Sequence, residues 1–210
     1  MNYFIEHVKG KISKDFFTSA ELDVILSGTK ARRYGVVKRA LAKGDLVQLR
    51  RGFYCLGSKN HRKPLDLFVL GNHIYGPSYL SLESALSWHR WIPEAVSVVT
   101  SCTALRQRVF TNNLGQFSYF TVPRQYMFSD VRRVEVPFGP FLIAEPWLAL
   151  MDYLYVFKKE WRGFQPLLKS LRLSEESLEK LTYERLAPIA ERYQSQRLFR
   201  FVESLKKERA

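Results

Sequence analysis

The chain has 210 residues, of which 46% are hydrophobic and 25% are charged. This composition is typical of a globular protein, and no apolar run reaches the roughly 18 to 20 residues that a membrane-spanning helix needs. The N-terminal segment lacks an uninterrupted hydrophobic signal core and a small-residue cleavage site. We therefore expect a cytoplasmic protein with no membrane partner.

The balance of charge is the first indication of function. The formal net charge is +13 at pH 7, and an excess of this kind usually serves a polyanionic partner. Residues 1–63 hold 14 Lys and Arg against 5 Asp and Glu, whereas residues 64–210 hold 19 against 15. Most of the excess therefore belongs to the first third of the chain, which predicts a small basic domain followed by a nearly balanced one.

A linker between the two domains is expected at Leu56–Pro64, where the residues are polar and basic and show no periodicity. This places the first domain at residues 1–60 and the second at residues 64–210. The two cysteines, Cys55 and Cys102, have no CxxC partner and no histidine at ligand spacing. We therefore expect no metal site and no cofactor, and we interpret the cysteines as free thiols, with a disulfide as the alternative.

The first domain is expected to begin with two helices. Ile5–Ile12 has the pattern of a short helix, and a second helix follows Thr18. Thr18 and Glu21 have the spacing of a capping box, and an apolar stripe behind them is expected to end at Gly28.

A third helix is expected from about Thr29. Successive residues of a helix are rotated by about 100 degrees about its axis. On this helix, one side therefore carries the residues expected to pack on the second helix, namely Tyr34, Val37, Ala40 and Leu41. The opposite side carries Arg32, Gly35 and Arg39, flanked by Lys38 and Lys43. Glycine costs about 1 kcal/mol relative to alanine inside a helix, so its place between two outward arginines favours a close approach to a DNA groove.

A tight hairpin is expected next, with strands at Leu46–Leu49 and Phe53–Leu56 and Arg50, Arg51 and Gly52 at its tip. Three helices and a basic-tipped hairpin predict a winged helix-turn-helix, in which the third helix enters the major groove and the wing contacts phosphates. The alternatives are a merely solvated basic face or a protein-interaction module. The residues expected to contact double-stranded DNA are Thr29, Lys30, Arg32, Arg33, Gly35, Lys38, Arg39, Arg50 and Arg51.

In the second domain, helical patterns cover residues 64–74, a helix opening at Ser81, and residues 146–157, with Pro146 in the first turn of the last. Alternating patterns predict strands in 96–103, 108–122 and 131–145, with a hairpin turn at Asn112–Gly115. The chain from Phe164 onward is helical in pattern, with Pro188 as a kink or a helix start. The fold class expected is α+β: a winged helix-turn-helix, then a mixed α+β domain with a C-terminal helical tail.

Two stretches resemble the AbiEi family of abortive-infection antitoxins: "GPSYLSLESALSWHRWIPEAVSVVT" (76–100) and "FLIAEPWLALMDYLY" (141–155). The motifs are Ser-x-Glu-Ser-Ala-Leu, an "IPE" turn running into "VSVVT", and Ile-Ala-x-Pro leading to Ala-Leu-x-Asp. A departure is Arg90, where family members more often have glycine.

The resemblance covers nearly the whole chain and implies a bacterial type IV antitoxin. Such a protein represses its own operon by binding operator inverted repeats, and it would then be found at the nucleoid. Its second domain counters a nucleotidyltransferase-like toxin without a stable complex.

Some residues of the second domain admit two interpretations. His89 and Glu94 could form an acid/base pair, but no nucleophile is positioned by spacing, so a surface turn is preferred. Asp152 lies in an apolar helix and needs a partner if it is buried, for which Arg132 or Arg133 is the structural expectation. Core packing is preferred to base stacking for Tyr119, Phe120, Tyr126 and Phe128, and helix capping to catalysis for Ser81, Glu83 and Ser84.

We do not expect an enzyme, because the chain contains no GxxxxGK[ST], GxGxxG or HExxH motif. Two alternatives to the antitoxin remain open. One is a group-transfer enzyme, a phosphotransferase that modifies the partner toxin. The other is a transcription factor whose second domain senses a small molecule.

Overall fold

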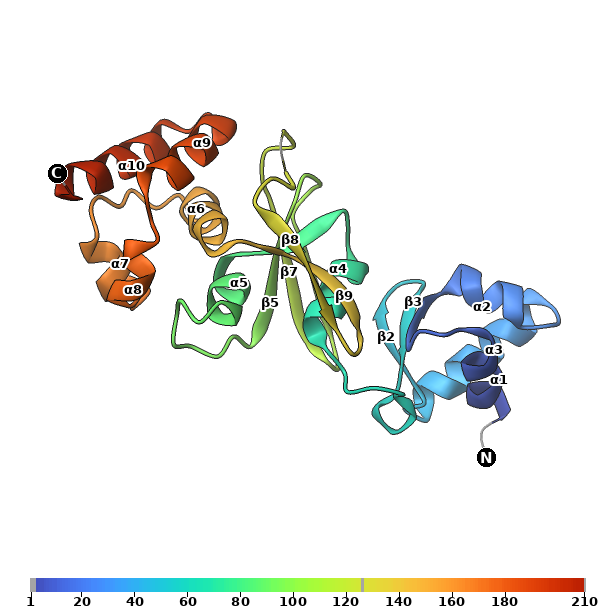
Figure 1. Ribbon diagram of the computed structural model, residues 1–210. Coiled ribbons are helices and arrows are strands. Elements are labelled where there is room, and N and C mark those ends of the chain that lie inside the picture. Colours follow the sequence, from blue (N-terminus) through green and yellow to red (C-terminus); the bar gives the residue numbers. More distant parts are fainter. Residues whose placement is uncertain (1–2, 126, 210) are drawn as a thin grey trace.

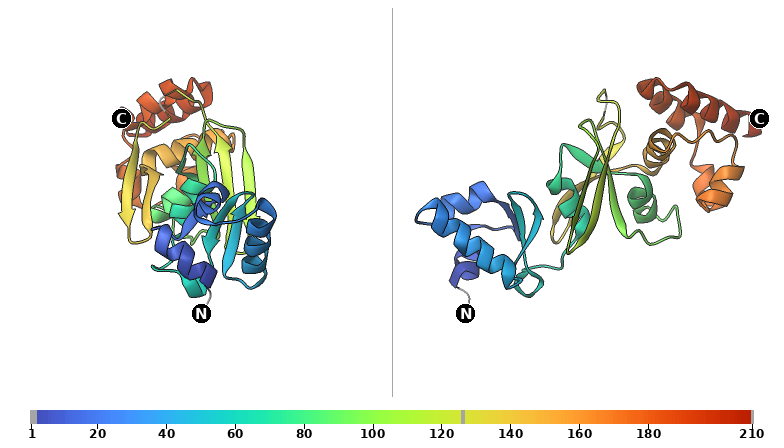
Figure 2. Two further views of the ribbon diagram at one scale, coloured as in Figure 1. Left: turned by 90° about the vertical axis from the view of Figure 1, so that its right-hand side faces the viewer. Right: turned by 180° about the vertical axis from the view of Figure 1, so that it is seen from behind.

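A computed structural model describes residues 3–125 and 127–209 (Figure 1). The chain forms two sheets and their covering helices, so the expected mixed α+β organisation is confirmed. The molecule is elongated, with the N-terminal helices at one end, the large sheet in the middle and the C-terminal helices at the other end (Figure 1 and the right panel of Figure 2). Within the described residues, no helix combines the length and apolar character that crossing a bilayer requires.

The N-terminal region consists of three helices and a three-stranded antiparallel sheet of order β1-β3-β2. The capping box predicted at Thr18 is present: its hydroxyl accepts from the Glu21 backbone N–H, and its own backbone N–H donates to the Glu21 carboxylate at 2.7 Å. The second helix ends at Ile25, before the expected Gly28. In chain order the elements are α1 (Tyr3–Lys11), β1 (Phe16–Thr18), α2 (Ser19–Ile25), α3 (Lys30–Ala42), β2 (Leu46–Arg50) and β3 (Phe53–Leu56).

The two faces of the small sheet belong to different cores. Alternate side chains of a strand point to opposite faces, so Phe17, Leu46 and Leu56 pack with the three helices. The other face carries Phe16, Leu49, Phe53 and Cys55, and these join the main core of the second domain. The hairpin expected as a free wing is therefore packed on the rest of the protein along one face.

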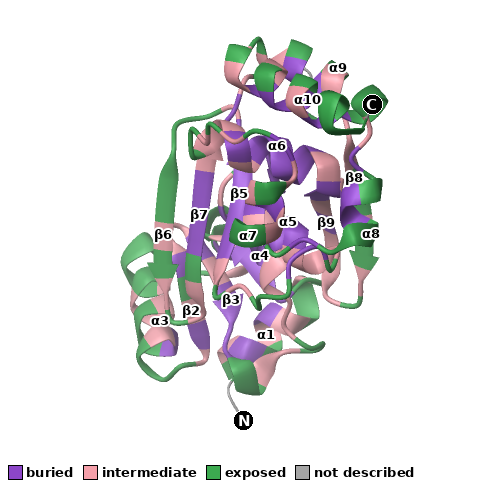
Figure 3. Cartoon of the chain, turned by 90° about the vertical axis from the view of Figure 1, so that its left-hand side faces the viewer, coloured by how far each residue is buried: buried purple, intermediate pink, exposed green. Residues whose placement is uncertain are grey.

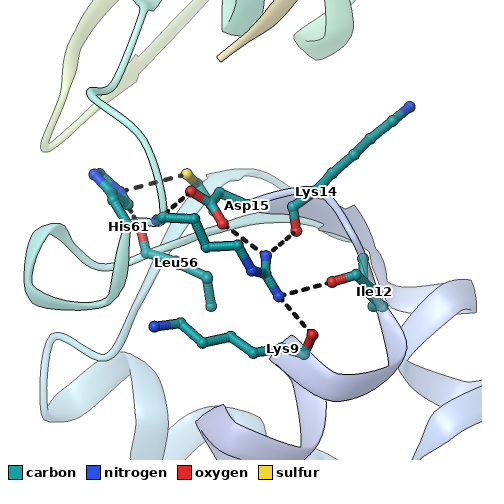
Figure 4. A network of polar contacts seen from close by, with 8 residues as sticks. Lys9, Ile12, Lys14, Asp15, Leu56 and His61 are labelled. Carbon is teal, nitrogen blue, oxygen red and sulfur yellow. Dashed lines mark hydrogen bonds and ion pairs between the residues drawn. The ribbon is translucent and has the colours of Figure 1, made fainter. Parts of the chain in front are cut away.

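The segment expected as a linker is held in place by Arg62 (Figure 4). Its guanidinium pairs with the buried carboxylate of Asp15 at 2.7 Å, and it donates to the carbonyls of Lys9, Ile12 and Lys14 at 2.7 to 3.0 Å. A short 3-10 helix, η1 (Ser58–Asn60), lies just before it. The carbonyls at and after the end of α1 need a donor, and Arg62 supplies it, so the segment between the two regions is anchored to the first.

The second domain is built on a six-stranded mixed sheet of order β6-β7-β5-β4-β9-β8. β5 runs parallel to β7, β4 runs parallel to β9, and the other pairs are antiparallel. The hairpin turn predicted at Asn112–Gly115 joins β6 to β7. The strands are β4 (Ser78–Leu80), β5 (Val98–Thr103), β6 (Arg108–Asn112), β7 (Gly115–Thr121), β8 (Val131–Val136) and β9 (Gly139–Ala144).

Helices cover both faces of this sheet. α4 (Leu67–Ile74) lies on the face toward the N-terminal region, while α5 (Leu82–Trp88) and α6 (Pro146–Val156) lie on the opposite face (Figure 1). Pro146 begins α6 as expected, whereas Pro188 lies inside a helix and does not start one. The C-terminal helices continue outward from α6 and comprise α7 (Gln165–Ser170), α8 (Glu175–Glu179), α9 (Tyr183–Tyr193) and α10 (Gln196–Arg209).

Candidate nucleic-acid interface

The basic helix α3 begins where the sequence predicted. The Thr29 hydroxyl accepts a hydrogen bond from the Arg32 backbone N–H at 3.3 Å, which caps the first turn. Ala40 is buried, and Val37 and Leu41 pack beside it on the N-terminal core. Tyr34 was expected on this packed face, but it is 70% exposed. The face of α3 that packs on the core is therefore turned slightly away from the predicted one. The ring of Tyr34 lies beside this packed face and not within it.

The outward side of α3 carries several positive charges, with Asp23 and Asp45 at its borders. Lys30, Arg32, Lys38 and Arg39 are exposed, and among the described residues none of them forms an ion pair. The sequence placed Arg32 and Arg39 on the outer face and Lys38 on its flank, while Lys30 lies nearer the groove side of the helix. A protein gains little stability from such exposed cations.

Arg33 differs from its neighbours on α3. Its Nε donates to the Asp23 carboxylate at 2.7 Å, and its Nη1 donates to the Gly28 carbonyl at 2.7 Å. These bonds tie α3 to the end of α2 and to the turn between the two helices. Arg33 is therefore engaged in fixing the angle between α2 and α3.

Gly35 has no packing reason to be a glycine. A methyl group added there would meet only Nη1 of Arg39, at 3.5 Å, which is ordinary van der Waals contact. Alanine would fit and would favour the helix by about 1 kcal/mol. The position is therefore free of packing constraints within the chain, and the end of the Arg39 side chain lies beside it.

The two arginines at the hairpin tip have different surroundings. Arg51 is exposed and precedes Gly52, whose φ of +72° suits glycine at the turn. Arg50 turns toward the second domain, where its Nε donates to the Ile74 carbonyl at 2.5 Å and its guanidinium lies 5.4 Å from the Phe53 ring centre. The structure therefore favours Arg51 over Arg50 as a group available to a phosphate.

A groove of about 560 Å³ runs between α2, α3 and the hairpin. Cationic and aromatic side chains line it, with Lys30, Tyr34 and Lys38 from α3 and Arg51 and Tyr54 from the hairpin. Of the residues expected to contact DNA, Lys30, Arg33, Lys38 and Arg51 line this groove, whereas Arg39 lines a separate hollow of about 200 Å³ with Lys43 and Asp45. We use the name α3 surface for the accessible side of α3 and the hairpin tip, which carries Thr29, Lys30, Arg32, Gly35, Lys38, Arg39 and Arg51. Arg33 and Arg50 border it and bond within the chain.

Asp152 is the most unusual polar residue of the second domain. It is fully buried on α6 and accepts hydrogen bonds from the hydroxyls of Tyr79 at 3.0 Å, Ser81 at 2.5 Å, and Tyr193. Burial raises the pKa of its carboxyl to about 6, although the hydroxyl hydrogen bonds act in the opposite direction. The cluster links β4, α6 and α9, and its burial keeps it from any substrate in solution.

The expected arginine partners of Asp152 were wrong. Arg132 pairs with Glu145 at 3.4 Å, and Arg133 pairs with Glu135 at 2.7 Å. Three neutral hydroxyls satisfy the carboxylate without bringing a second charge into the core, which avoids a further desolvation cost. The sequence carried one signal of this arrangement, since Asp152 is the single charged residue in the apolar stretch 146–157.

His89 and Glu94 are not an acid/base pair. The His89 ring contacts the Ala144 carbonyl at 2.8 Å, whereas Glu94 pairs with Arg172. Burial lowers the pKa of His89, which favours the neutral ring.

The Ser81 hydroxyl bonds Asp152 instead of capping α5, so the capping interpretation is wrong for its side chain. Core packing is confirmed for Tyr119, which is buried, and for Phe120, which packs against the core. Phe128 is 46% exposed, contrary to that interpretation, and Tyr126 lies outside the described residues.

Cys55 and Cys102 are free and buried, and burial raises the pKa of the Cys55 thiol to about 12. In the parts of the chain that the structure describes, no group of three or more His, Cys, Asp or Glu side chains could hold a metal ion.

No family model matches the chain, and a search of curated proteins also found no match. The resemblance to the abortive-infection antitoxins therefore rests on the motifs in residues 76–100 and 141–155. The geometry of the α3 surface stands independently of it.

Proposed function

We propose that the N-terminal region is a winged helix-turn-helix that binds double-stranded DNA through the α3 surface. The observation that carries the proposal is the set of exposed, unpaired cations around Gly35 on α3. The order α1-β1-α2-α3-β2-β3, with β1 beside β3, supports it, because such a fold presents its third helix to the major groove and its hairpin to the backbone.

The roles of the residues follow from their chemistry. Arg32 and Arg39 project from either side of Gly35, and an arginine fork can donate two hydrogen bonds to the O6 and N7 atoms of a guanine. Lys30, Lys38 and Arg51 lie at the borders of the surface, where they neutralise phosphates whatever the sequence. The buried face of α3 and the Arg33 bonds hold this arrangement before DNA binds.

The wider role that we propose is that of an antitoxin which represses its own operon. The motif resemblance supports this role, with inverted repeats as the operator and the second domain acting against a nucleotidyltransferase-like toxin without a stable complex. The location expected is the cytoplasm, at the nucleoid when the protein is bound.

The test is a binding titration of the full chain on DNA from upstream of its own gene and on random DNA. Arg32→Ala and Arg39→Ala are each expected to cost about 1 to 3 kcal/mol on the specific duplex and less on random DNA. Arg51→Ala is expected to weaken both duplexes alike and to lower the salt dependence. Arg200→Ala, a change of an exposed arginine on α10, is the matched control and is expected to have no effect.

Equal losses on both duplexes for Arg32, Arg39 and Arg51 would refute the division into base-reading and phosphate-binding residues. A wild-type protein that binds no duplex even at low salt would refute DNA binding itself.

The antitoxin role is tested separately, by co-expression with the neighbouring gene and scoring of growth. The double variant Arg32→Ala/Arg39→Ala is expected to lose repression and to keep growth rescue, because both residues belong to α3, which Figure 1 shows apart from the second domain's sheet. Absence of rescue by the wild-type protein would refute the role and leave DNA binding untouched.

A further inference from the structure

A second acid-free stretch lies in the second domain. Residues 95–129 contain no Asp or Glu and carry three arginines, Arg106, Arg108 and Arg124. All three are exposed, and none forms an ion pair among the described residues. Such cations resemble those of α3, whereas Arg132, Arg133 and Arg192 of the same domain are each paired with a carboxylate.

The fold brings this stretch next to the hairpin. β6 packs beside β2, and the Asn112 side-chain amide donates to the Leu49 carbonyl at 3.2 Å. Figure 3 shows α3, β2 and β6 along the same edge of the molecule, and the opposite view in the left panel of Figure 2 agrees. Arg108 on β6 and Arg106 just before it therefore lie on the edge of the molecule that also carries α3 in these views.

The spacing suits one piece of duplex. A strand rises about 3.3 Å per residue, so Arg108 lies roughly 13 Å along β6 from Asn112, and Arg106 follows it. A turn of B-DNA is about 34 Å long. Arg108 and Arg106 thus lie within less than one turn of B-DNA of the point where β6 meets the hairpin.

Contacts between the small sheet and α4 fix the position of the hairpin relative to β6. The Arg50 bond to Ile74 and the aromatic contact of Phe16 with His73, whose ring centres are 4.6 Å apart, join the small sheet to α4. Phe53 and Leu49 bury their side chains in the same core. The second domain therefore holds β6 at a set position relative to α3.

We propose that β6 and the residues just before it form a second phosphate-binding strip, in which Arg106 and Arg108 contact the backbone of the duplex that α3 reads. The second domain would then contribute to DNA affinity and to the length of the footprint, without reading bases. This inference rests on the proposed DNA binding.

The test uses the full chain with Arg106→Gln/Arg108→Gln and with the control Arg200→Gln/Lys207→Gln. Both double variants remove two exposed charges, and the control pair lies on α10 at the other end of the molecule (Figure 1). Binding to the specific and to the random duplex is measured between low and moderate salt. Thermal unfolding shows that both variants remain folded.

The strip variant is expected to lower the slope of log affinity against log salt by about 2 on both duplexes, since each lost phosphate contact removes about 0.9. Its hydroxyl-radical footprint is expected to lose protection at one flank only. The control is expected to keep the slope and footprint of the wild type.

If log affinity falls with log salt at the same slope for the strip variant and the wild type, the phosphate-binding strip is refuted, while DNA binding by the α3 surface is not. A loss confined to the specific duplex would also overturn it, because that result means base reading. A wild type that binds no DNA would overturn the proposed function itself, and the strip with it.

Discussion

The helices α3 and α6 use polar side chains in opposite ways. On α3, Lys30, Arg32, Lys38 and Arg39 are exposed and form no ion pair among the described residues, while Arg33 pairs with Asp23. On α6, one carboxylate is fully buried and accepts hydrogen bonds from the hydroxyls of Tyr79 on β4, of Ser81 just after β4, and of Tyr193 on α9. We expect the buried carboxylate of α6 to serve stability and the exposed cations of α3 to serve binding, and substitutions can separate the two.

The largest effect is expected for Asp152→Ala, measured at pH 5 so that the carboxyl is mostly neutral. The change leaves three buried hydroxyls without their acceptor and opens a small cavity, so the free energy of unfolding is expected to fall by about 4 kcal/mol. Chemical denaturation measures it, and Tyr193→Phe, which removes one hydroxyl, is the milder comparison. Wild-type stability in Asp152→Ala would contradict the importance of the cluster.

The next effect is a pH dependence carried by Asp152. Its pKa is about 6 in the folded protein and about 4 in an unfolded chain, so the folded state binds the proton more tightly. The stabilisation is therefore complete below about pH 4 and is lost as pH rises to about 6, a fall of about 3 kcal/mol. Subtracting the profile of Asp152→Asn isolates this contribution from the other carboxyls, and identical profiles would contradict it.

A smaller and opposite effect is expected for Gly35→Ala on α3. Alanine is the better helix former, and the added methyl group meets only the end of Arg39, so the protein is expected to gain about 1 kcal/mol of stability. DNA binding is expected to fall at the same time, because the methyl group stands where the helix backbone approaches the groove. Chemical denaturation measures the stability and a DNA titration of the same preparation measures the affinity. An unchanged affinity would contradict a close approach of DNA to the helix backbone at Gly35.

The smallest change in stability is expected for Arg39→Ala, within about 0.5 kcal/mol of the wild type, since the side chain is exposed and unpaired. A loss above 1 kcal/mol would mean that Arg39 belongs to the fold, and would weaken the contrast between α3 and α6.

Local signals predicted the elements whose determinants lie within a few residues. The capping box at Thr18, the start of a helix near Thr29 and the turn at Asn112–Gly115 are of this kind, and all three are confirmed. The strand Ser78–Leu80 was missed, because its three residues are all buried and offer no alternation.

Features that depend on contacts between residues far apart in the chain could not be predicted from the sequence. The parallel pairs β5/β7 and β4/β9 join strands through the core and leave no mark in a single segment. The partners of Asp152 come from β4 and α9, about 40 to 70 residues away along the chain. On the α3 surface, the side carrying Arg32 and Arg39 was predicted, while the exposure of Tyr34 and the inward turn of Arg50 depend on neighbours that only folding supplies.

The small sheet with two buried faces sets a limit on dissection by truncation. A fragment cut at residue 60 would lose Arg62 and bare the ring of Phe16 and the side chains of Leu49 and Phe53. A fragment with these apolar side chains exposed would aggregate, and the loss of soluble protein would be mistaken for a loss of affinity for DNA. Single substitutions in the intact chain are therefore the better way to assign functions to the N-terminal region and to the second domain.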